Sequence, residues 1–105
     1  MTQTHATVGS RAELHVQNVY RRKLAQIVHV VDILAQRHEV DLSSVKHIIF
    51  QPEEDHMAVY FEPYPSGIAG DFLFNKEICQ HIAQQAKTEL LVATYDDGYV
   101  YWRMR

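Results

Sequence analysis

The sequence has almost no cysteine, no excess of charge of one sign and no long apolar run. Cys79 is the single cysteine among 105 residues, which excludes an internal disulfide and fits a reducing compartment. The net charge of -3 excludes a whole-molecule field that would attract nucleic acid or an anionic membrane. Polar residues interrupt every apolar stretch before the roughly 18 residues that a membrane span requires. These absences predict a cytoplasmic protein without membrane association, and they name no function.

The length and composition predict one domain. Residues 1–9 have neither the basic start nor the apolar run of a secretory signal, so we expect a flexible tail followed by a single domain over 10–105. With 47% hydrophobic and 22% charged residues, the composition is that of a globular protein. A chain this short removes about two thirds of its surface from water on folding. Further burial in a homodimer would therefore stabilise it.

Two segments resemble each other and suggest an internal repeat. Ile33-Leu34-Ala35-Gln36 precedes Val59-Tyr60-Phe61-Glu62, and His81-Ile82-Ala83-Gln84 precedes Val100-Tyr101-Trp102-Arg103. The first member of each pair has a helical pattern, whereas the second is rich in residues that favour strands. The repeat predicts two successive units of a helix followed by a hairpin, on condition that the second hairpin is shorter.

The first helix is predicted from Ser10 to about Arg37. Ser10 and Glu13 have the spacing of a capping box. Apolar residues then recur every three or four positions, which places them on one stripe; they are Tyr20, Leu24, Ile27, Val31 and Leu34. From Ile27 to Ala35 the helix is apolar almost all round, which favours burial on two sides. Val30 and Ile33 are therefore a candidate dimer surface.

The middle of the chain predicts a hairpin, a loop and a second helix. Residues 45–50 and 57–62 are rich in β-branched and aromatic residues, and the acidic turn between them predicts a solvent-exposed hairpin tip at 53–56. Residues 63–70 contain two prolines and two glycines, which is typical of an irregular loop. The second helix is expected from about Phe72 or Lys76 to Lys87, capped by Asp71 or Asn75.

The last segment predicts a second hairpin over 89–95 and 99–105. Asp97-Gly98 favours a two-residue type I′ turn, which would pair Tyr95 with Val100 and Leu91 with Met104. Alternation along the strands then separates two faces. The expected core face contains Leu91, Ala93, Tyr95, Val100, Trp102 and Met104. The expected outer face contains Val92, Thr94, Tyr99, Tyr101, Arg103 and Arg105.

The predicted fold class is α+β in the order α-β-β-α-β-β. A four-stranded, mainly antiparallel sheet would be covered on one face by two helices. The strand order stays open at this point: if the two middle strands were neighbours, they would run parallel through a right-handed crossover.

The outer sheet face is the first candidate site, with Tyr60, Tyr99, Tyr101 and Arg103. Aromatic rings and arginines on a sheet can bind single-stranded nucleic acid. The acidic net charge and the lack of an RNA-recognition signature argue against that partner. Tyrosine and arginine are also enriched at protein interfaces. The leading interpretation is a homodimeric binding module whose aromatic sheet face recognises a protein or small ligand.

The alternative is a small-molecule-binding protein or small enzyme. Its pocket would lie between the sheet and the 63–70 loop, where His47 and Tyr64 supply polar groups and Gly67 and Gly70 let a ligand approach the backbone.

No residue pattern predicts a catalytic group, a metal site or a cofactor. His29 with Asp32 and Glu77 with His81 lie one helical turn apart, but neither pair is a metal-binding signature. Cys79 lies on the apolar stripe of the second predicted helix, so we expect it to be a core residue with an unreactive thiol.

Overall fold

The structure, a computed structural model, describes residues 13–15, 18–94 and 99–105. A five-stranded sheet has the order β1-β2-β3-β5-β4. The elements in chain order are β1 (Glu13–His15), α2 (Asn18–Arg37), β2 (His47–Pro52), β3 (Met57–Glu62), α3 (Gly67–Leu73), α4 (Lys76–Ala86), β4 (Leu90–Thr94) and β5 (Val100–Met104).

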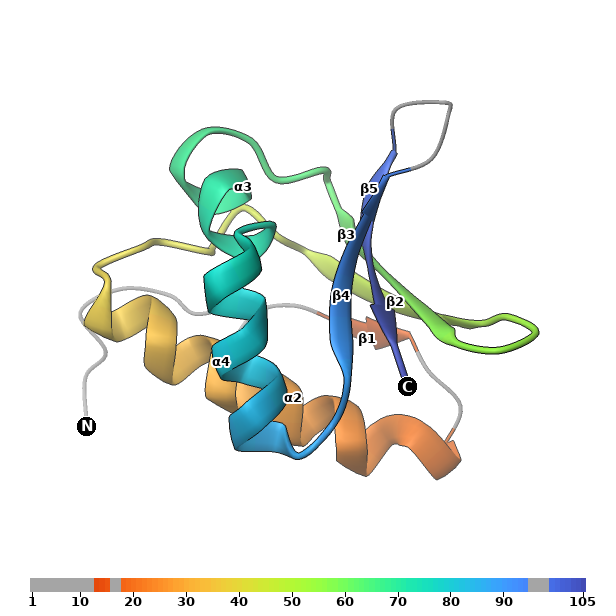
Figure 1. The fold of residues 1–105 in the computed structure, drawn as a ribbon. Helices are drawn as coiled ribbons and strands as arrows, with labels where there is room; N and C mark the ends of the chain where they lie inside the picture. Colours follow the sequence, from red (N-terminus) through yellow and green to blue (C-terminus); the bar gives the residue numbers. More distant parts are fainter. Residues whose placement is uncertain (1–12, 16–17, 95–98) are drawn as a thin grey trace.

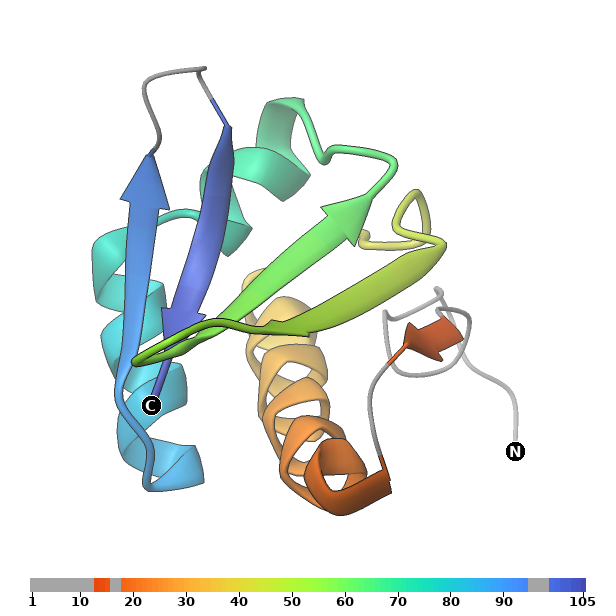
Figure 2. The ribbon, with the colours of Figure 1, turned by 90° about the vertical axis from the view of Figure 1, so that its right-hand side faces the viewer.

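The α+β fold and the order of its elements are confirmed. The helices lie on one face of the sheet (Figure 1), and the strands form the other side of the molecule (Figure 2). All pairs among β2, β3, β5 and β4 are antiparallel. The connection through α3 and α4 places β4 outside β5, so β3 and β4 are not neighbours and the parallel crossover is not adopted.

The start of the first helix differs from the prediction. Glu13 lies in β1, whose backbone pairs parallel with β2 from His47 to Ile49, and the helix begins at Asn18. Ser10 lies outside the described residues, as do residues 1–9. The edge of β2 offers backbone partners that a local pattern cannot reveal, so tertiary pairing overrides the capping-box signal at Glu13. The end of the helix at Arg37 agrees with the prediction.

The predicted loop over 63–70 is only partly irregular. Residues 67–73 form α3, so the loop ends after Ser66. The helix predicted to follow this loop is α4, which begins at Lys76. The Asn75 side chain accepts hydrogen bonds from the backbone N–H groups of Glu77 and Ile78. Asn75 is therefore the cap of α4. A helix that contains two glycines is not recognisable from propensity, because its stability comes from burial of Ala69, Phe72 and Leu73.

The predicted register of the last hairpin is wrong by one residue. Leu90 pairs with Met104 and Thr94 with Val100, whereas we predicted Leu91 with Met104. A shift of one residue exchanges the two faces of β4. Leu90 is accordingly buried and Leu91 is 48% exposed. Burial of Leu90 in the core decides the register, while the predicted turn at Asp97-Gly98 and the predicted core residue Tyr95 lie outside the described residues.

The core lies between the inner sheet face and the helices. Val59, Phe61, Trp102 and Met104 are buried, as predicted for β3 and β5. The apolar half of α2 is buried within the single chain, except for Val30, which is half-buried, and Ile33, which is exposed. One copy of the chain thus covers most of the surface that suggested burial on two sides.

The two strands matched in the predicted repeat, β3 and β5, pair antiparallel with each other. In the predicted repeat, residues 59–62 correspond to residues 100–103, so Phe61 corresponds to Trp102. In the sheet, Trp102 pairs with Val59. The matched residues Tyr60 and Tyr101 stack on each other, with ring centroids 5.1 Å apart. These contacts do not test the internal repeat, which stays a prediction.

Candidate functional site

A cleft of about 780 Å³ lies on the sheet face opposite the helices. Its floor consists of outward-facing residues of β2 and β3, and its walls come from the segment after β3 and the start of β5. The lining residues are His47, Ile49, Gln51, Tyr60, Phe61, Glu62, Pro63, Tyr64, Tyr99 and Val100. The volume is within the range of sites that bind small organic molecules.

Ring contacts connect the aromatic walls of the cleft to the core. Tyr64 stacks on Phe74 with ring centroids 5.8 Å apart, and Phe74 meets the edge of Phe61 at 5.9 Å. Phe61 in turn meets Trp102 at 4.8 Å. On the other side, Tyr60 rests on Tyr101, which is only 1% exposed. Because the buried ring of Tyr101 supports Tyr60 and the partly buried ring of Phe74 supports Tyr64, both tyrosines are held in place before any ligand binds.

Among the lining residues that the structure describes, Glu62 is the only one that carries a formal charge at neutral pH, and none is a lysine or arginine. Tyr60, Tyr64 and Tyr99 provide π faces, which attract cations as well as flat neutral rings. His47 and Gln51 add groups that can both donate and accept hydrogen bonds. The chemistry of the described lining therefore suits a flat ligand that is neutral or cationic, because none of these residues offers an anion a lysine or arginine.

The residues predicted for the aromatic sheet face divide into two groups. Tyr60 and Tyr99 line the cleft, and Tyr99 is 58% exposed. Tyr101 lies on the outward side of β5 but is buried, so it supports Tyr60 rather than meeting a partner directly. Arg103 is half-buried and does not line the cleft, and its Nε is buried without a hydrogen-bond partner in the part of the chain that the structure describes.

The residues predicted for the alternative pocket are only partly brought together. His47 and Tyr64 line the same cleft as Tyr60 and Tyr99, so the two predicted sites overlap. Gly70 instead lines a second cleft of about 470 Å³, which shares Tyr64 and Val100 with the first. Gly67 lines neither of these two clefts. Sequence reasoning missed Ile49, Gln51 and Glu62, although their alternation along β2 and β3 was a usable signal.

The remaining candidates are structural. Cys79 lies in the core, where burial raises the pKa of its thiol to about 12 and the thiol donates to the Leu73 carbonyl. Among residues 13–15, 18–94 and 99–105, no three histidine, cysteine, aspartate or glutamate side chains are grouped so that they could share a metal ion. Within the same residues, no helix is long and apolar enough to cross a membrane.

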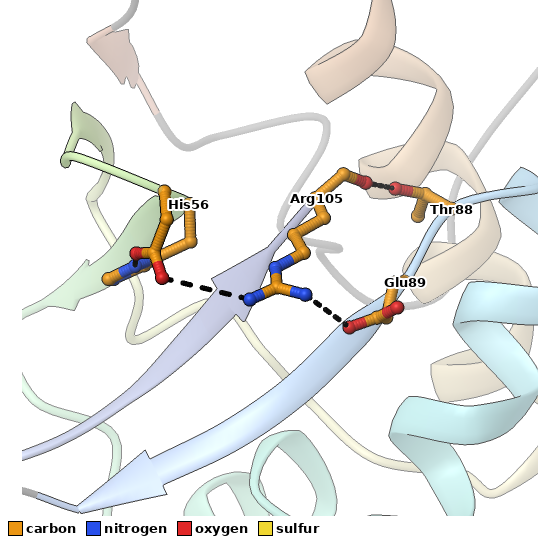
Figure 3. A network of polar contacts seen from close by, with 5 residues as sticks. His56, Thr88, Glu89 and Arg105 are labelled. Atoms are coloured by element: carbon orange, nitrogen blue, oxygen red, sulfur yellow. Dashed lines mark hydrogen bonds and ion pairs between the residues drawn. The ribbon is translucent and has the colours of Figure 1, made fainter.

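A polar network at the other end of the sheet was not predicted (Figure 3). Asp55 accepts a hydrogen bond of 2.8 Å from Nδ1 of His56, and Arg105 lies 3.7 Å from Asp55 and 3.8 Å from Glu89. The Thr88 hydroxyl donates to the main-chain oxygen of Arg105. Asp55 is exposed as expected at a hairpin tip, but the His56 side chain is only 12% exposed. The network joins the β2–β3 hairpin to Glu89, directly before β4, and to Arg105, directly after β5.

We expect the Asp55 interaction to stabilise the fold above pH 4 and to be lost in acid. The hydrogen bond from His56 is the main reason why the pKa of Asp55 lies below its ordinary value, and the charge of Arg105 acts in the same direction. Stability from this pair is fully present above the unfolded pKa of about 3.9 and disappears as the pH falls through the lower folded pKa. Asp55→Asn should therefore lower the Tm slightly at pH 7, and this difference from the natural chain should shrink as the pH falls below 4. Glu54→Gln, which removes the neighbouring exposed carboxylate, is the control; an equal effect of both variants in thermal scans would contradict the prediction.

Comparison with known protein families, with curated proteins and with solved structures gave no match. The functional argument accordingly rests on the geometry and chemistry of the cleft.

Proposed function

We propose that the protein is a binding module that holds a flat organic ligand, neutral or cationic, in the cleft on its outer sheet face. The observation that supports this function most directly is the meeting of Tyr60, Tyr64 and Tyr99 around one cavity with Glu62 at its border. Such a combination of aromatic faces and one carboxylate is typical of sites for cationic ligands. The proposal assigns no catalytic step to these residues.

Binding should be tested by NMR with three probes of similar size. They are benzyltrimethylammonium, benzyl alcohol and benzoate, which are cationic, neutral and anionic. We expect benzyltrimethylammonium to bind most tightly and to shift backbone amide signals of residues 47–51 and 60–64, with benzyl alcohol weaker and benzoate without effect. Equal binding of benzoate, or shifts spread over the helices, would contradict the proposal.

Two substitutions separate the contributions of charge and aromatic surface. Glu62→Gln should weaken benzyltrimethylammonium by about threefold to tenfold and leave benzyl alcohol unchanged, because only the cation interacts with the carboxylate. Glu77→Gln, the same change on the exposed side of α4, is the matched control and should change neither affinity. Tyr99→Ala should weaken both the cation and the alcohol, since both contact the ring.

A further inference from the structure

The strand β4 forms an edge of the sheet (Figure 2) and has an unusual composition for that position. Its residues, Leu90 to Thr94, include no charge, no proline and no glycine. Edge strands generally carry lysine, proline or a bulge, or are very short, because unpaired backbone groups otherwise attract another strand. The opposite edge, β1, has only three residues. β4 is therefore the exposed edge that is best suited to pair with another strand.

The hydrogen-bonding pattern shows which backbone groups face outward. The Arg105 N–H donates to the Glu89 carbonyl at 3.0 Å, so Glu89 and Arg105 form a hydrogen-bonded pair across β4 and β5. Such pairs alternate along antiparallel strands. The N–H and C=O groups of Leu90, Val92 and Thr94 consequently point away from β5, toward the free edge.

The described residues leave a groove beside this edge. This groove of about 740 Å³ lies between α4 and the first half of β4, lined by Gln80, Ala83, Gln84, Leu90 and Leu91. These five residues carry no charge, whereas Lys87, Glu89 and Arg105, which also line the groove, lie outside both elements. Leu91, on the outer sheet face, is one of the few large apolar side chains in the described residues that remain about half exposed.

We propose that β4 pairs antiparallel with the same strand of a second copy, which joins the two sheets into one continuous sheet. With a two-fold axis at Val92, Leu90 pairs with Thr94 of the partner subunit and Val92 pairs with Val92 of the partner subunit. This register pairs the outward backbone groups of all three residues. It also places Leu91 opposite Ala93 of the partner subunit, a small residue that leaves room for the leucine side chain.

A second copy is favoured over an unrelated peptide because the strand complements itself. The uncharged sequence of β4 brings no like charges together in this register, and α4 contributes Gln80, Ala83 and Gln84 beside it. The cleft that carries the proposed function lies on β2 and β3, so pairing through β4 leaves it accessible. The two proposals can therefore fail independently.

Light scattering coupled to size exclusion, over a wide range of loading concentrations, tests the pairing. We expect a dimer for the natural chain and monomers for Leu91→Lys and Thr94→Pro. Thr94 is exposed and its N–H points outward, so proline removes no hydrogen bond to β5. The matched control is Ile33→Lys, which makes the same kind of change at a 39% exposed apolar residue on α2 and should stay dimeric. A monomeric natural chain, or a dimer that only Ile33→Lys disrupts, would overturn the proposal.

Hydrogen exchange read by NMR provides a second test that is independent of mutation. In the dimer, the amides of Leu90, Val92 and Thr94 should exchange more slowly as the protein concentration rises. Leu91 and Ala93, whose amides bond to β5 in either state, should show little dependence on concentration. Fast, concentration-independent exchange at Val92 in a dimeric sample would show that another surface forms the dimer.

Discussion

Replacement of Trp102 by alanine is expected to lower the free energy of unfolding by about 3–5 kcal/mol, a large part of the stability of a small domain. Trp102 is 2% exposed, meets Phe61 edge to face at 4.8 Å and donates from its indole Nε1 to the Leu73 carbonyl at 2.7 Å. The alanine variant loses the ring contacts and the hydrogen bond together. Urea unfolding followed by circular dichroism measures the effect, because Trp102 is the only tryptophan and its fluorescence is lost in the variant.

The hydrogen bond can be separated from the packing with Trp102→Phe. This variant retains an aromatic ring but removes the indole donor from the Leu73 carbonyl, which keeps the weaker bond from the Cys79 thiol, 3.4 Å away. We expect a loss of about 1–3 kcal/mol. Tyr99→Ala, a change at a 58% exposed residue next to the same strand, should stay within about 0.5 kcal/mol of the natural chain. An unchanged urea midpoint for Trp102→Phe would show that the indole N–H does not stabilise the fold.

Substitution of Gly70 by alanine is expected to destabilise the protein by about 1–3 kcal/mol and to deform the cleft. A Cβ at Gly70 would lie 2.7 Å from the Pro65 carbonyl oxygen and 3.3 Å from the carbonyl carbon. Both atoms belong to the backbone, so either α3 or the segment before it must move. Tyr64 precedes Pro65 and lines both clefts, which means that this movement should also weaken ligand binding.

The control for Gly70→Ala is Gly67→Asn. Gly67 has a φ of +60°, a conformation that asparagine tolerates, and a Cβ there would meet no atom within 4 Å. Because residues with a side chain adopt this φ at some cost, we expect a small decrease in Tm, less than that of Gly70→Ala, and an affinity for benzyltrimethylammonium close to that of the natural chain. If Gly70→Ala shows the same Tm as Gly67→Asn, the close approach of Pro65 does not constrain the fold.

The location of the cleft was only partly predictable from the sequence. Tyr60 and Tyr64 are near in sequence, and His47 could be related to them through the first hairpin. Tyr99 reaches the cleft because β5 pairs with β3, and the strand order was open at the level of sequence. Two sites that looked like alternatives therefore overlap in the structure.

The buried side chain of Tyr101 shows why burial on the outer face of a sheet is difficult to predict from sequence. Alternation correctly placed Tyr101 on the side away from the helices. Alternation does not show that Tyr60 of the adjacent strand stacks on the ring and contributes to its burial. Tyr101 was predicted to contact a ligand or partner, but its ring instead supports the ring of Tyr60, which lines the cleft.

The sequence by itself determined the class of the fold, the ends of β3, and the inward positions of Val59, Phe61, Trp102 and Met104, because these follow from local periodicity. Only the tertiary structure decided that Glu13 joins a strand, that Leu90 rather than Leu91 enters the core, and that β5 lies between β3 and β4. Each of these outcomes depends on a partner that is distant along the chain. At such positions, the local preference of a residue contributes less free energy to folding than the backbone pairing and apolar burial that the distant partner provides.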